Sequence, residues 1–116
     1  MGLFDFADSR IGVARWAAKW FREARRQNPS MPDNDIIEVA LLTRYHPIPL
    51  NQQQADILHA ERHMATDIYG LCHLIAEIEL LSHLDMMDRM NLRKGGEGIV
   101  EHTYGVIDRE IKKLGF

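Results

Sequence analysis

The stretch LCHLIAEIELLSHL, residues 71–84, is where the sequence constrains the architecture of this chain most strongly. On a helical wheel of about 100° per residue, its leucines and isoleucines fall on nearly every side. A helix that is apolar all round is buried on all sides. Because 116 residues offer few places to bury such a helix, we expect two copies to form a homodimer with this stretch in the seam.

The helical period of this stretch continues in both directions. Asn51 is a suitable N-cap, and the pattern runs on to the Gly-rich segment that begins at residue 95, which predicts one long helix over 51–94. About 44 residues would span about 66 Å, whereas a compact 100-residue domain has a radius of gyration near 13 Å. We therefore expect a kink, near Gly70 or around residues 82–87, or a second chain that covers the overhang.

Three further segments also have helical spacing of their apolar residues. They are a basic amphipathic helix at 3–27, a short helix at 33–46, and a C-terminal helix at 99–114 that follows the glycine linker 95–98. No segment shows sustained strand alternation. The prediction is one all-α domain over residues 1–116, a small helical bundle built around one long central helix, straight or kinked, and dimeric.

Composition narrows the classes of function. The chain is 46% hydrophobic and 27% charged, and its net charge of −3 argues against a general nucleic-acid binder. The single cysteine excludes an internal disulfide and any Cys-based zinc knuckle. No apolar run reaches the roughly 20 residues of a transmembrane helix, and the N-terminus lacks a signal-peptide pattern. We therefore expect a cytoplasmic protein without a transmembrane segment.

Charged and imidazole side chains interrupt the apolar stretch and need partners if they are buried. His73 with Glu77, and Glu79 with His83, are i,i+4 pairs on two sides of the predicted helix. One interpretation is structural: ion pairs, or polar groups bonded across a dimer seam. The alternative is a metal site, because imidazole and carboxylate on one helix face can hold iron or zinc in a helical bundle.

A second imidazole pair lies earlier in the same predicted helix. His59 and His63 are four residues apart, and Glu61 between them points away from both. The spacing permits an exposed metal site, and a solvated polar face is the simpler interpretation. No bound cofactor at all is the leading expectation, with iron or zinc as the alternative.

The segment 3–27 carries a basic ridge beside aromatic residues. Residues 1–28 have a net charge of +3, from six basic and three acidic side chains, against −6 for the remainder. The ridge and its neighbours are candidates for docking on a partner or membrane: Arg15, Trp16, Lys19, Trp20, Arg22 and Arg26. The helix covers the core, docks on a protein, or lies on an anionic membrane surface.

No catalytic constellation emerges. The three serines lack a nucleophile-elbow context, and Cys72 falls on the predicted core face, where a free cysteine behaves as a small hydrophobe. The leading hypothesis is a non-enzymatic interaction or accessory protein that acts as a helical homo-oligomer. The alternatives are a metal-binding helical bundle and a peripheral membrane protein.

Overall fold

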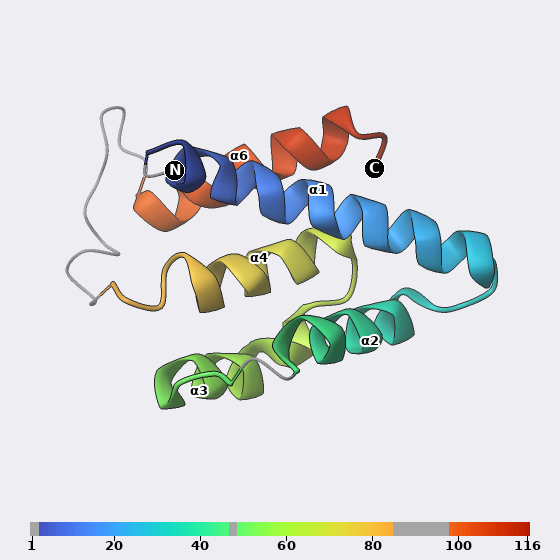
Figure 1. Ribbon diagram of the computed structural model, residues 1–116, viewed down its shortest axis with the longest axis horizontal. Helices are drawn as coiled ribbons and strands as arrows, with labels where there is room; N and C mark the ends of the chain where they lie inside the picture. Colours follow the sequence, from blue (N-terminus) through green and yellow to red (C-terminus); the bar gives the residue numbers. More distant parts are fainter. Residues whose placement is uncertain (1–2, 47–48, 85–97) are drawn as a thin grey trace.

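A computed structural model describes residues 3–46, 49–84 and 98–116, and Figure 1 shows their arrangement. Within these ranges the chain forms helices and no strand, which confirms the all-α prediction for them. The elements are α1 (Leu3–Gln27), α2 (Asp33–Tyr45), α3 (Gln52–Glu61), the 3-10 turn η1 (Arg62–Met64), α4 (Ile68–Glu79) and α6 (Ile99–Lys113). None of the helices described here is both long and apolar enough to cross a membrane.

Helix α4 lies at the centre of the bundle. It packs against α1, α2, α3 and α6, with α1 and α6 side by side on one flank and α2 and α3 on the other (Figure 1). The side chains of Leu71, Cys72, Ile75 and Ile78 are completely buried, and they meet Val13 of α1, Ile37 of α2 and Ile107 of α6 in one core cluster. The Cys72 thiol donates to the Val13 carbonyl oxygen at 4.0 Å, which ties α4 to α1.

The single long helix expected over 51–94 is not present in the described residues. The chain turns back between α3 and α4, at residues 62–67. Asp67 caps α4 by accepting the Gly70 backbone N–H at 2.9 Å. The backbone of α4 passes so close to the turn that a Cβ on Gly70 would lie 2.9 Å from the Ala65 Cα. The kink expected near Gly70 thus lies a few residues earlier, at residues 62–67, where the chain reverses direction, and Gly70 itself makes a close backbone contact.

The reversal lets α3 fold back beside α4. Asn51 and Gln54 form a capping box, in which the Asn51 side chain accepts the Gln54 backbone N–H at 2.8 Å and the Gln54 side chain accepts the Asn51 N–H. The Gln54 amide also donates to the Ile78 carbonyl oxygen at 3.0 Å, and Gln53 donates to the carbonyl oxygen of Ser82. These bonds hold the start of α3 against the end of α4. Residues 85–94 of the expected helix, and 95–97 of the linker, lie outside the described residues.

This arrangement removes the argument for a dimer seam at 71–84. Leu74 is 4% exposed, Leu81 is 3% exposed, and Leu71 and Ile78 are fully buried within one chain. The four helices around α4 supply the surroundings that the sequence reasoning assigned to a second copy. The inference that this stretch needs a partner chain is wrong, because the break after α3 allows a short α4 to be surrounded.

Candidate functional site

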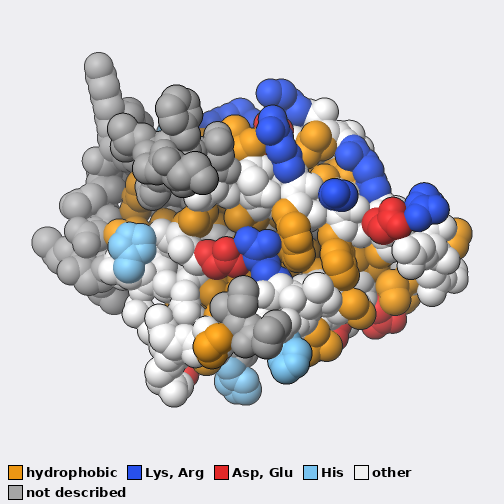
Figure 2. All heavy atoms as spheres, viewed as in Figure 1, with side chains coloured by type: hydrophobic (Ala, Val, Ile, Leu, Met, Phe, Trp, Pro, Cys, Tyr) orange, Lys and Arg blue, Asp and Glu red, His pale blue; other side chains and the backbone are white. Residues whose placement is uncertain are grey.

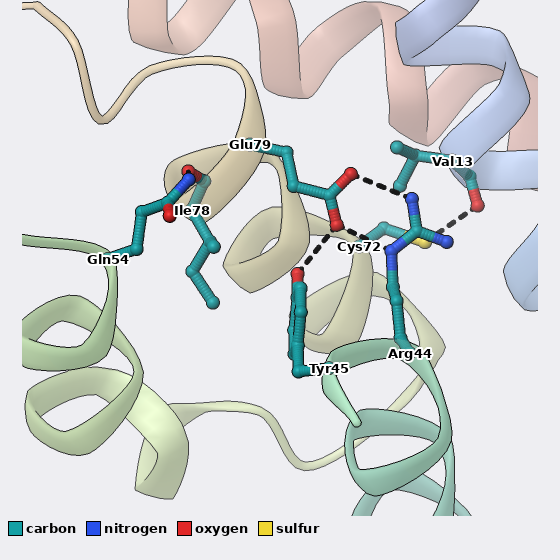
Figure 3. A network of polar contacts seen from close by, with 7 residues as sticks. All are labelled: Val13, Arg44, Tyr45, Gln54, Cys72, Ile78 and Glu79. Carbon is teal, nitrogen blue, oxygen red and sulfur yellow. Dashed lines mark hydrogen bonds and ion pairs between the residues drawn. The ribbon is translucent and has the colours of Figure 1, made fainter. Parts of the chain in front are cut away.

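A polar network joins the ends of α2 and α4 to α1 (Figure 3). The Arg44 guanidinium donates to both carboxylate oxygens of Glu79, at 2.5 and 2.8 Å, and Tyr45 donates its hydroxyl to Glu79 at 2.7 Å. The guanidinium carbon lies 4.6 Å from the centroid of the Trp16 ring. A single arginine from α2 therefore contacts both α4 and α1.

The surroundings of the network raise the pKa values of Arg44 and Tyr45. Hydrogen bonding to Glu79 is the largest influence on Arg44 and raises its pKa further above its already high ordinary value. Burial, followed by the charge of Glu79, raises the pKa of Tyr45 far above the ordinary phenol value. Tyr45 is therefore a neutral donor under physiological conditions, and its hydroxyl donates to Glu79.

Next to this network the surface between α1 and α2 is apolar. Trp16 and Trp20 stack with their ring centroids 5.7 Å apart. Beyond them lies a groove of about 320 Å³. Its lining consists of the apolar residues Trp20, Ala24, Met31, Ile36 and Val39 and the polar residues Glu23, Gln27 and Asn28. Val39 lines this groove and is 43% exposed, and Leu42, about one turn further along α2, is 61% exposed. We call the surface formed by Trp16, Trp20, the groove and the exposed side of α2 the α1–α2 face. Figure 2 shows hydrophobic side chains gathered in the area where α1 and α2 lie next to each other.

The predicted basic ridge borders the α1–α2 face along the outer side of α1, where Figure 2 shows Lys and Arg side chains. Arg15 donates to Glu110 of α6 at 3.1 Å, Arg26 pairs with Glu23, and Arg22 lies over the Phe116 ring at 5.1 Å. Of these residues, Arg15 joins α1 to α6, and Arg22 joins α1 to the C-terminal Phe116. The tryptophans are half-buried, and Arg44 covers one face of Trp16.

The polar residues on α4 find described partners on neighbouring helices. His73 bonds through Nε2 to Asp108 at 2.7 Å and stacks on Tyr104 with the ring centroids 4.0 Å apart. Tyr104 in turn donates to Glu77 at 2.8 Å, where Glu77 is 5% exposed. The structure thus brings His73 and Glu77 to one cluster, through α6 residues that the sequence reasoning did not single out.

The other predicted ligand pairs are separated. Glu79 is engaged by Arg44 and Tyr45, while His83 is exposed beyond the end of α4. His59 lies in α3 and His63 in η1, so the two do not share one continuous α-helix. Across the described parts of the chain, no three His, Cys, Asp or Glu side chains are grouped to hold a metal ion. An iron or zinc site at these residues stays a prediction.

Comparisons with known proteins add no assignment. No protein family, curated protein or solved structure matches this chain. The α1–α2 face combines a groove beside Trp20 with exposed apolar side chains of α2.

Proposed function

We propose that this protein is a non-enzymatic interaction protein that acts as a homo-oligomer through its α1–α2 face. The observation that carries the proposal is the apolar groove beside Trp20, together with the exposed Val39 and Leu42 on the adjoining side of α2. Apolar groups that cluster beside a polar rim are typical of protein interaction surfaces. Half-buried tryptophan is one of the residues that most often contribute binding energy at such surfaces.

A second copy of the chain suits this face because exposed charges of both signs border its apolar centre, and Arg26 and Glu38 among them already pair with Glu23 and Arg62. Lys19 and Arg26 lie on the α1 side, and Asp35 and Glu38 lie on α2. A two-fold axis places the same patch of both copies in contact. In an antiparallel arrangement, the basic side of one copy then faces the acidic side of the other, while the apolar residues meet between them.

The area required is compatible with two helices. A standard interface covers about 800 Å² on each partner, and the accessible surface of the chain is 7603 Å². About a tenth of the surface would therefore be covered. This is the scale of a patch that one helix pair presents, and it requires no rearrangement of the core.

The test is to measure oligomeric mass over a range of protein concentrations, by light scattering coupled to size-exclusion chromatography. We expect a concentration-dependent dimer in the wild type and a monomer in the Val39→Lys/Leu42→Lys variant, because lysine at both positions places charge in the apolar centre. Met64→Lys is the matched control, since Met64 is 63% exposed and lies in η1, outside the α1–α2 face.

The control is expected to dimerise as the wild type does. A wild type that stays monomeric at every concentration contradicts self-association. A double-lysine variant with the wild-type dimer fraction shows that another surface joins the two copies. Circular dichroism of each variant verifies that its helices are intact.

A further inference from the structure

A band of exposed basic side chains crosses the junction of α1 and α6. Arg15 of α1 and Lys113 of α6 both contact the Glu110 carboxylate, at 3.1 and 3.7 Å, and Arg22 lies over the Phe116 ring just beyond the end of α6. These contacts bring basic residues of the two helices side by side, on the flank where Figure 2 shows Lys and Arg side chains. With the exposed residues three or four positions away on the same helix sides, the set consists of Arg15, Lys19, Arg22, Arg26, Arg109 and Lys113. We call it the α1–α6 band.

The band carries more positive charge than its ion pairs neutralise. Glu110 serves both Arg15 and Lys113 and is itself only 5% exposed, and Glu23 pairs with Arg26. The other three cations of the band form no ion pair with any residue that the structure describes. The exposed surface at this junction is therefore positive.

Charge is also segregated between the two flanks of the bundle. Helices α1 and α6 together contain nine basic and six acidic residues, whereas α2 and α3 on the other flank contain one basic and five acidic residues (Figure 1). The smallest extent of the molecule is 30 Å, several times the Debye length of about 8 Å at physiological ionic strength. An anionic surface that meets the band is thus screened from the acidic flank, so the net charge of −3 does not oppose this one orientation.

We infer that the α1–α6 band docks on the surface of a lipid bilayer that contains anionic lipid. The cations are spread over two neighbouring helices, which matches a plane of headgroups better than the narrow line of phosphates along a nucleic-acid strand. Phe116 is 42% exposed beside Arg22, and phenylalanine next to Lys and Arg is typical of surfaces that bind in the headgroup region. Each basic side chain held near such a bilayer adds to the attraction.

The test is co-sedimentation of the full chain with vesicles of phosphatidylcholine that contain roughly a third phosphatidylserine, compared with vesicles of phosphatidylcholine alone. We expect at least tenfold tighter binding to the anionic vesicles. Binding should weaken at least tenfold as the ionic strength rises from about 0.05 to about 0.3 M, because salt screens the attraction. Absence of binding to the anionic vesicles at the lower ionic strength, or equal binding to both kinds of vesicle, would overturn the inference.

Two variants with the same change of net charge locate the contact. Arg109→Gln/Lys113→Gln removes two charges of the band from α6, outside the α1–α2 face, and should weaken binding to the anionic vesicles at least tenfold. His59→Glu/Ala60→Glu is the matched control, because it adds two negative charges at exposed positions of α3 on the opposite flank. The control should bind as the wild type does. An equal loss in both variants would show that binding follows net charge, and wild-type binding by the α6 variant would refute the role of the band.

Circular dichroism verifies that the helices of both variants are intact. Lys19→Glu serves if the α6 variant does not fold, because Lys19 is exposed and its replacement changes the charge of the band by the same amount. The same loss of vesicle binding is then expected.

Duplex DNA added at a phosphate concentration equal to that of the anionic lipid separates a bilayer from a nucleic acid as the occupant. We expect most of the protein to stay on the vesicles, because only the bilayer offers an apolar region to Phe116. Displacement of the protein by the DNA would overturn the assignment to lipid and indicate a nucleic-acid surface instead.

Discussion

Replacing Arg44 with methionine is expected to lower the free energy of unfolding by about 2 kcal/mol. Methionine keeps an unbranched side chain of similar reach, so the change removes the charge and its hydrogen bonds more than the packing. The side chains of Arg44 and Glu79 are only 23% and 30% exposed, and their contact is bidentate. Such a pair exceeds a typical surface ion pair and contributes about 1 kcal/mol. The cation–π contact with Trp16 contributes about 1 kcal/mol more.

Urea denaturation followed by far-ultraviolet circular dichroism measures this change. In a chain of this size, a loss of about 2 kcal/mol corresponds to a fall in Tm of about 8 °C. Arg26→Met is the matched control, because its ion pair with Glu23 is solvent-exposed, with side chains 71% and 51% accessible. Removing that pair should leave stability unchanged within error.

A double-mutant cycle with Glu79→Gln separates the ion pair from the contact with Trp16. The Arg44→Met/Glu79→Gln variant should be more stable than the sum of the two single changes predicts, by about 1 kcal/mol. Additive single effects would show that the two side chains do not interact in solution. A change no larger than that of Arg26→Met would refute the view that Arg44 joins α1, α2 and α4.

Three further predictions concern glycine and cysteine positions. Gly70→Ala should destabilise the fold by more than about 1 kcal/mol, because the new Cβ meets the Ala65 backbone at 2.9 Å. Gly12→Ala should instead stabilise α1 by about 0.5–1 kcal/mol, because a Cβ there has nothing within 4 Å. Denaturation midpoints measure both changes, and the same sign of change in the two variants would contradict the geometry. Burial, with a smaller effect from Asp108, raises the pKa of the Cys72 thiol to about 12, so iodoacetamide at about pH 8 should alkylate the native chain at least a hundredfold more slowly than the chain in urea. Equal alkylation rates in the native chain and in urea would contradict the buried position of Cys72. The unfolded thiol ionises from about pH 8.5, so above that pH the native state binds more protons than the unfolded state. The free energy of unfolding should therefore fall as the pH rises.

The helices could be predicted from the sequence wherever local signals mark both ends. α1 spans Leu3–Gln27, the range expected from its periodicity, and α2 and α6 end one residue short of the expected 46 and 114. The reversal between α3 and α4 was different, because no proline or glycine marks residues 61–67. Asp67 and Gly70 were the available signals. Asp67 forms an N-cap, and Gly70 makes a close backbone approach. From the sequence alone, these two features could not be distinguished from an irregularity within one continuous helix.

The polar contacts were less predictable than the helices. The i,i+4 spacing of His73 and Glu77 correctly places them on the same side of α4, but their described partners come from α6. Tyr104 and Asp108 have the same i,i+4 spacing, which was a readable sign of two matching polar faces. The contact of Arg44 with Glu79 spans 35 residues, and no local spacing could indicate it, because it depends on how α2 and α4 are aligned.

The stacking of Trp16 on Trp20 has a consequence for how this protein can be observed. These are the two tryptophans of the chain, and they lie within 5.7 Å of each other where α1 meets α2 and Arg44. All indole emission from the molecule therefore originates at one spot. The stacked rings should also couple their electronic transitions and give a paired circular-dichroism band in the near ultraviolet. That band would act as a built-in optical label for opening between the first two helices, with no dye and no change of sequence.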